Sequence, residues 1–88
     1  MAKYTLSFKH SVEKDCRKIP KELLLGIFSH IKQLSENPHP HDSRKLAGAE
    51  SVYRIRVGEY RIIYQVQHES REVIVYYIRH RSMAYRGV

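Results

Sequence analysis

Two stretches of alternating side chains, joined by Gly58-Glu59, constrain the fold of this chain more than any other feature of its sequence. Residues 52–57 and 60–67 place polar and apolar side chains mostly in alternation, which is typical of half-buried strands. A leading glycine suits the two-residue II′ turn because glycine adopts positive φ without strain. The pattern therefore predicts an antiparallel β-hairpin.

The turn also fixes which residues of this hairpin face each other. With Val57 opposite Tyr60, the next pair along the strands is Arg56 and Arg61, and Arg54 lies one pair further on the same face. Like charges directly opposite each other weaken a sheet. Stability alone does not favour this arrangement, whereas a bound phosphate would turn the repulsion into attraction.

The N-terminal half predicts one strand and a first helix. Residues 3–8 alternate strictly, and their inward-facing side chains are expected to be Tyr4, Leu6 and Phe8. Ser11 is expected to cap a short helix. Its apolar face is formed by Val12, Cys16 and Ile19.

A second helix and a last strand complete the expected fold. Pro20 suits the first position of the second helix, whose apolar stripe comprises Leu24, Ile27, Phe28, Ile31 and Leu34. Residues 37–42 form a loop, and residues 72–78 form a third strand after the hairpin. The prediction is a single α+β domain over residues 1–88, in the order β-α-α-β-β-β. Its small antiparallel sheet carries the helical hairpin on one face, over Ile55, Val57, Ile62 and Tyr64.

The sequence is strongly basic, with a formal net charge of +7. Residues 44–88 hold nine Lys or Arg against four acidic residues, and eight of the nine are arginine. Arginine grips phosphate through two parallel hydrogen bonds and stays charged at any cellular pH. The charge favours a polyanionic partner held by the C-terminal half, with a merely solvated basic face as the alternative.

The last part of the sequence is rich in side chains that can bind phosphate or transfer a proton. Residues 79–86 contain three arginines, His80 and Tyr85. Histidine exchanges a proton near neutral pH, and tyrosine can stack on a nucleobase or donate a proton. This ending is a candidate part of the functional surface, and a frayed basic tail is the alternative.

Three motifs together resemble the RelE/ParE toxin superfamily: Lys45-Leu46-Ala47-Gly48, the hairpin over residues 53–64, and the ending His80-Arg81 with Tyr85-Arg86. The resemblance covers nearly the whole chain. It implies a toxin of a toxin–antitoxin system. RelE-type members are endoribonucleases that cut mRNA on translating ribosomes, whereas ParE-type members share the fold and poison DNA gyrase. The ending favours the RelE type, and a gyrase poison without nuclease activity is the alternative.

The resemblance implies a role for each matching position. Arg54 and Arg56 would flank the scissile phosphate, and Arg61 would stabilise the charge that develops on phosphorus. Arg81 would assist the leaving oxygen, and Tyr85 would stack on or orient a base. The residues expected to contact RNA are Lys45, Arg54, Arg56, Arg79 and Arg86.

The family reaction is attack of a ribose 2′-hydroxyl on the adjacent phosphate, giving a 2′,3′-cyclic phosphate without a metal or any cofactor. The best-known member has lysines at the positions of Arg54 and Arg56, and an arginine cannot serve as a general base. The resemblance therefore leaves the base open. His80 and Tyr85 are the candidates for proton transfer, and His80 is favoured.

The resemblance also implies partners: mRNA in the A site of the 70S ribosome, and an acidic, partly disordered cognate antitoxin protein. No membrane association is expected, because the longest apolar run covers residues 23–28 and a span needs about 20 residues. The N-terminus lacks the apolar region of a signal peptide, so a cytoplasmic protein is expected.

The other polar and aromatic residues are expected to have structural rather than catalytic roles. The run His39-Pro40-His41-Asp42 is expected to be a loop rather than a metal site, and Cys16 a buried small hydrophobe. Glu59 is expected to be a turn residue that can restrain Arg61. The remaining histidines, expected at the surface without an identified partner, are His10, His30 and His68. The tyrosines expected to pack in or on the sheet are Tyr53, Tyr60, Tyr64, Tyr76 and Tyr77.

Overall fold

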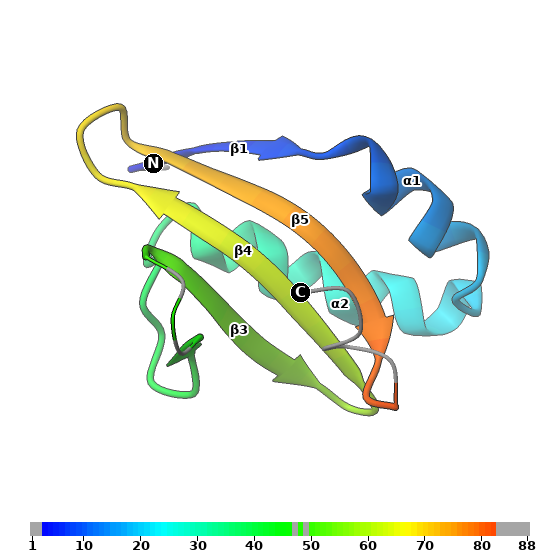
Figure 1. Cartoon of the computed structure of the whole chain (residues 1–88). Helices are drawn as coiled ribbons and strands as arrows, with labels where there is room; N and C mark the ends of the chain where they lie inside the picture. The colour runs from blue at the N-terminus through cyan, green and yellow to red at the C-terminus, as the bar shows by residue number, and fades with distance from the viewer. Residues whose placement is uncertain (1–2, 47, 49, 83–88) are drawn as a thin grey trace.

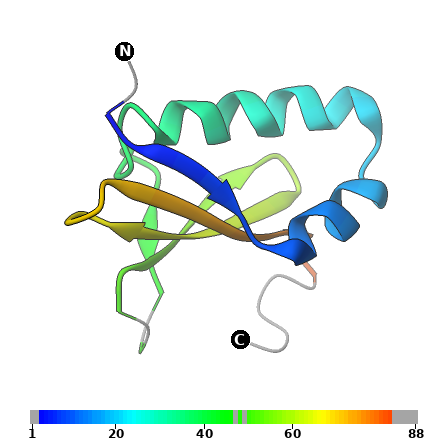
Figure 2. The same cartoon turned by 90° about the horizontal axis from the view of Figure 1, so that it is seen from above.

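The structure is a computed structural model that describes residues 3–46, 48 and 50–82. Within this part of the chain, the longer helix packs across one face of a five-stranded mixed sheet, and the shorter helix lies at the edge of the sheet beside the last strand, an α+β fold (Figures 1 and 2). The elements in chain order are β1 (Thr5–Phe8), α1 (His10–Arg17), α2 (Lys21–Leu34), β2 (Arg44–Lys45), β3 (Val52–Val57), β4 (Tyr60–Gln67) and β5 (Glu72–His80). None of the described helices is long and apolar enough to span a bilayer.

The predicted hairpin is confirmed with its register. Strands β3 and β4 pair antiparallel, with Val57 opposite Tyr60 and Arg56 opposite Arg61. Gly58 has a φ of 60° in the turn, as the II′ geometry requires. Strand β5 pairs antiparallel with β4 and runs to His80, two residues further than predicted.

The sheet differs from the prediction at its two edges. The strand order is β1-β5-β4-β3-β2, and β1 pairs with β5 in parallel, so the sheet is mixed rather than purely antiparallel. Strand β2, absent from the prediction, pairs antiparallel with β3 and places Arg44 opposite Arg54. A strand of two residues is too short to show alternation, which explains why the sequence pattern did not reveal it.

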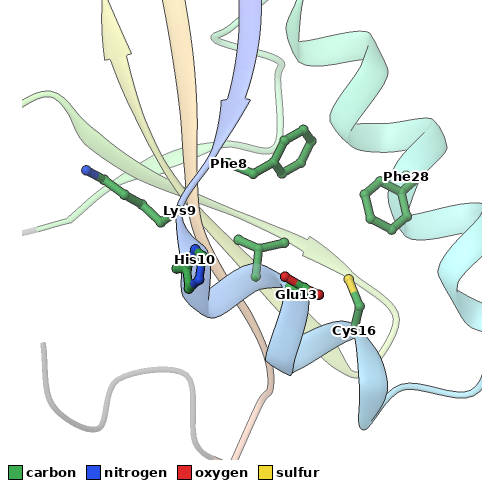
Figure 3. A pocket seen from close by; sticks show the side chains of 7 residues that line it. Phe8, Lys9, His10, Glu13, Cys16 and Phe28 are labelled. Atoms are coloured by element: carbon green, nitrogen blue, oxygen red, sulfur yellow. The ribbon is translucent and has the colours of Figure 1, made fainter.

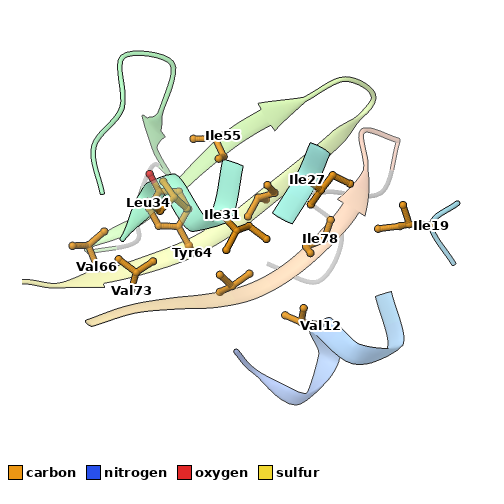
Figure 4. Packing of buried hydrophobic residues seen from close by; sticks show 12 residues of the cluster. Val12, Ile19, Ile27, Ile31, Leu34, Ile55, Tyr64, Val66, Val73 and Ile78 are labelled. Carbon is orange, nitrogen blue, oxygen red and sulfur yellow. The ribbon is translucent and has the colours of Figure 1, made fainter. Parts of the chain in front are cut away.

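The core lies between α2 and the helix-facing side of the sheet (Figure 4). Ile27, Ile31 and Leu34 recur along α2 at spacings of one helical turn, and each is only 1% exposed. Each side chain of this kind contributes about 1.5–3 kcal/mol on burial. The sheet's buried contribution to the same cluster is Ile55, Ile62, Tyr64, Val66, Val73, Val75 and Ile78.

Three local predictions are corrected. Helix α1 begins at His10 with Lys9 at the cap position, and the Ser11 hydroxyl instead donates to the Tyr76 carbonyl at 2.6 Å. Pro20 occupies the cap position of α2 rather than its first helical position. Phe8 is 45% exposed rather than inward, and Phe28 is 38% exposed, with ring centroids 6.2 Å apart. Both rings lie outside the buried cluster, Phe8 at the end of the edge strand β1 and Phe28 on α2.

Candidate active site

Five arginines lie on the face of the sheet away from the helices. In the pairing register Arg56, Arg61 and Arg79 form one row across β3, β4 and β5. Arg44 and Arg54 form a second row across β2 and β3. These five residues are called the arginine face below. Strand alternation explains the placement, because the intervening residues Ile55, Ile62 and Ile78 are buried toward the helices.

Arg61 is the central residue of the longer row, and some of its side-chain hydrogen-bond donors have no acceptor within the described part of the chain. Its Nε and one terminal nitrogen are buried and have no hydrogen-bond partner among the described residues. A buried charged donor without an acceptor is costly, and a like charge lies opposite it on each neighbouring strand, Arg56 on β3 and Arg79 on β5. An anionic ligand would supply the missing acceptor and offset the repulsion.

A hollow of about 390 Å³ opens at the β2–β3 side of this face. It is lined by Asp42, Arg44, Arg54 and Arg56. Sequence reasoning identified Arg54 and Arg56 as site residues but missed Asp42 and Arg44, because neither belongs to a strand that alternation could reveal. Three guanidinium groups around one hollow suit a phosphate, and a carboxylate there adds a proton acceptor.

Lys45 and Arg79 are placed differently from each other. Lys45 is exposed, and its cross-strand partner Tyr53 belongs to the helix-facing side, so Arg44 rather than Lys45 carries the charge of β2 onto the arginine face. The Arg79 guanidinium lies 4.1 Å from the centroid of the Tyr77 ring, a cation–π contact that orients it over the sheet.

His80 does not lie with the arginine face. Along β5 it follows the alternation of Ile78 toward the helix side, and its ring lies 5.6 Å from that of Tyr60. Both rings line a second hollow of about 390 Å³ together with Asp15, Lys18 and Arg79. The histidine that the sequence favoured for proton transfer thus lies on the other side of β5 from Arg79, while its Nε2 is 4.0 Å from Oε2 of Glu59, the oxygen that also contacts Arg81.

Arg81 is held by the β3–β4 turn. Its Nε lies 3.0 Å from Oε2 of Glu59, and its backbone N–H donates to the Glu59 carbonyl at 2.7 Å. The Glu59 carboxylate thus contacts Arg81 rather than Arg61, contrary to the restraint that the sequence suggested. Tyr85 and Arg86, the two remaining candidate site residues, lie outside the described residues.

His39, in the loop after α2, contacts a histidine of the β4–β5 turn. Nε2 of His39 lies 3.0 Å from Nε2 of His68, and the other ring nitrogen of His68 is 2.7 Å from the Tyr4 hydroxyl. His68 therefore has two partners that the sequence did not identify. Burial, together with the neighbouring His68, lowers the pKa of His39. Asp42 belongs instead to the hollow beside the arginines.

An apolar hollow of about 450 Å³ lies at the other side of the molecule, where Phe8 and Phe28 face each other near Cys16 (Figure 3). Burial, with a smaller effect of Asp15, raises the pKa of the Cys16 thiol. A thiol held in its protonated form is a poor nucleophile.

Comparison with known proteins places the chain in a family. The profile of the family described as the ParE toxin of type II toxin–antitoxin systems, parDE, matches residues 6–85. A candidate toxin of Methanocaldococcus jannaschii, RelE1, is 32% identical over 97% of this chain and 98% of its own length. Toxin RelG of Mycobacterium tuberculosis is 30% identical over 94% of this chain and 97% of its own.

A solved structure has the same fold. The archaeal RelE–RelB complex from Pyrococcus horikoshii contains a chain that superposes with a TM-score of 0.81 at 26% identity, covering 93% of this chain and 99% of that one. Sequence profile, relatives and fold thus coincide over nearly the full length of the protein. The chain belongs to the RelE/ParE superfamily and is a RelE-like toxin of a type II toxin–antitoxin system.

Proposed function

We propose that this toxin is a metal-independent endoribonuclease that cleaves mRNA in the A site of the ribosome and thereby stops translation. The observation that carries the proposal is that two nitrogens of the Arg61 guanidinium, between Arg56 and Arg79, are buried without a hydrogen-bond partner among the described residues. A row of three cations with an unsatisfied centre suits a phosphate whose charge increases during the reaction.

The proposed reaction is attack of the ribose 2′-hydroxyl on the adjacent phosphorus. The bond from phosphorus to the 5′-oxygen breaks, and the products are a 2′,3′-cyclic phosphate and a free 5′-hydroxyl. Arg54 and Arg56 hold the phosphate from β3, and Arg61 stabilises the additional negative charge on the phosphorane. Arg81, positioned by Glu59 at 3.0 Å, neutralises the leaving oxygen. Arginines supply the charge that a metal would otherwise supply.

The experiment is cleavage of ribosome-bound mRNA by purified toxin that has been stripped with EDTA and then freed of the chelator, in a buffer whose Mg²⁺ keeps the ribosome assembled, with cuts mapped by primer extension. We expect cuts within the A-site codon and a cyclic phosphate at the new 3′ end. Arg61→Ala should lower the rate by about 100-fold or more. Arg17→Ala is the matched control, because Arg17 lies on α1 and pairs only with Glu13 among the described residues. Intact mRNA with the wild-type toxin would contradict the proposal.

The family description also names ParE, so inhibition of gyrase is the second candidate. A supercoiling assay with the same preparation separates the two. Gyrase inhibition without RNA cleavage would reverse the assignment, whereas RNA cleavage with normal supercoiling would support the nuclease.

We also infer that a cognate antitoxin covers this surface. RelE of Pyrococcus horikoshii was crystallised with RelB, and the toxin described here has a formal charge of +7 with an exposed arginine side chain at position 56. An acidic, partly disordered antitoxin would neutralise the arginine face and stabilise the toxin through binding. Co-purification with the product of the neighbouring reading frame tests this, and the affinity should fall as salt rises.

A further inference from the structure

The arginine face has phosphate-binding groups but needs a proton acceptor for the reaction proposed above. The 2′-hydroxyl must lose a proton as it attacks phosphorus, and an arginine practically cannot take one. His80, the histidine nearest in sequence, is directed toward the helix side with Tyr60. Within the described part of the chain, a proton acceptor beside the phosphate-binding arginines of β3 therefore has to come from another element.

Asp42 is the carboxylate that the fold brings to the phosphate-binding arginines. It lines the hollow of about 390 Å³ together with Arg44, Arg54 and Arg56, although 12 positions separate it from Arg54 in the sequence. The pairing of β2 with β3, with Arg44 opposite Arg54, holds the end of its loop against the sheet. Among the described residues that line this hollow, Asp42 is the one side chain able to accept a proton.

The loop that carries Asp42 is fixed by short hydrogen bonds. The Ser43 backbone N–H and the Ser43 hydroxyl each donate to the Pro40 carbonyl at 2.9 Å. One Arg44 terminal nitrogen donates to the carbonyls of His41 and Ser43, at 3.2 and 2.8 Å. These bonds constrain the backbone on both sides of Asp42. Its exposed carboxylate forms no ion pair within the described part of the chain, so it is available to a substrate.

We propose that Asp42 is the general base of this toxin, an inference that rests on the proposed RNA cleavage. The Asp42 carboxylate takes the proton of the 2′-hydroxyl, and the 2′-oxygen forms its bond to phosphorus. The bond from phosphorus to the 5′-oxygen breaks, and that oxygen takes a proton from solvent water. The protonated carboxyl then returns its proton to the hydroxide that remains, so charge and atoms balance. Arg54 and Arg56 hold the phosphate beside the base throughout.

The test separates turnover from binding on ribosomes programmed with mRNA. Asp42→Asn should lower the single-turnover rate by about 100-fold or more, the scale of losing a general base. Binding to mRNA that carries a 2′-deoxyribose at the cleavage position should be unchanged or tighter in this variant, because a negative charge leaves a phosphate-binding hollow. A rate loss combined with unweakened binding distinguishes a base from a residue that only positions the arginines.

A second variant tests whether an added carboxylate can replace that of Asp42, and a control removes a carboxylate elsewhere. Asp42→Ala leaves space for a small carboxylate, so added formate should raise its rate in proportion to concentration, and chloride at equal ionic strength should not. Glu69→Gln removes the same charge from the exposed β4–β5 turn and should cleave normally.

The other possible results contradict either the role of Asp42 alone or the proposed function as a whole. Wild-type cleavage with Asp42→Asn equally active would overturn the role of Asp42 and leave the proposed function intact. A loss of rate that follows a matching loss of binding would also overturn it. No cleavage by the wild-type toxin would overturn the proposed function, and this inference with it.

Discussion

Glu59 holds Arg81 at two points, through its carboxylate at 3.0 Å and through its backbone carbonyl at 2.7 Å. The first residue after β5 is thereby tied to the turn that joins β3 and β4. Two segments separated by more than twenty residues in the chain meet at the end of the arginine row. The leaving-group cation of the proposed reaction is thus positioned by the hairpin that carries the phosphate-binding arginines.

Glu59→Gln tests the contribution of the carboxylate to this arrangement. The backbone bond survives the substitution, and the ion pair is largely exposed on both sides, so its loss should lower the cleavage rate by about 5-fold or less. The difference from wild type should shrink as salt rises, because salt screens exposed charges. Single-turnover rates at low and high salt measure this. A loss as large as that of Arg81→Ala would show that the carboxylate takes part in the chemistry itself.

Arg61→Met should separate stability from activity. The substitution removes two buried nitrogens that have no hydrogen-bond partner among the described residues, together with a like charge opposite Arg56, so the free energy of unfolding should rise by about 1 kcal/mol. Cleavage should fall by about 100-fold or more. Urea denaturation checks the first effect, with Arg17→Met on α1 expected to stay within about 0.5 kcal/mol of wild type. A destabilised Arg61→Met would mean that the side chain contributes to packing.

Tyr64→Phe should destabilise the fold. The Tyr64 hydroxyl is buried and donates to the Pro38 carbonyl at 2.8 Å, and burial raises the pKa of this tyrosine to about 12. Without the hydroxyl, the carbonyl of the buried Pro38 loses its donor, at a cost of about 1–2 kcal/mol. Thermal unfolding measures the loss. Tyr4→Phe is the control, because its hydroxyl bond to His68 is exposed and should contribute less.

The loop after α2 should make stability depend on pH. Burial and His68 lower the pKa of His39, so the unfolded chain binds a proton more readily than the folded one. The free energy of unfolding should be highest above the unfolded value, about 6.5, and should fall as pH drops through it toward the lowered folded value. His39→Gln should remove this part of the dependence, and His30→Gln on α2 should retain it. Identical pH profiles for wild type and His39→Gln would contradict the argument.

The sequence predicted the parts of the molecule that depend on local pattern. Alternation and the glycine turn gave the register that sets Arg56 opposite Arg61, and helical spacing identified Ile27 and Ile31 as core residues. The same alternation, continued from Ile78, also indicates that His80 points to the opposite side of the sheet from Arg79. This orientation was not predicted, because the polar residues 79–86 were treated as one group.

Features that depend on pairing between segments far apart in the sequence could not be predicted from local pattern. The parallel contact of β1 with β5 has no local signature, and it leaves Phe8 at an exposed edge. Asp42 lies in a loop without periodicity, and only the pairing of Arg44 with Arg54 brings it to the arginines. The predicted start of α1 was wrong because the Ser11 hydroxyl donates to the backbone carbonyl of Tyr76 on β5 and does not cap the helix.

The parallel pairing of β1 with β5 has a consequence for the order of assembly. Thr5 lies beside Glu72 and Phe8 beside Val75, so the first strand cannot be completed into the sheet until almost the whole chain has been synthesised. Contacts that span so many residues slow folding, because the loop entropy is lost before the contacts form. Strand β1, which carries the exposed Phe8, is therefore the last strand to gain its partner. A protein that binds the nascent toxin has time to do so before the last strand is in place.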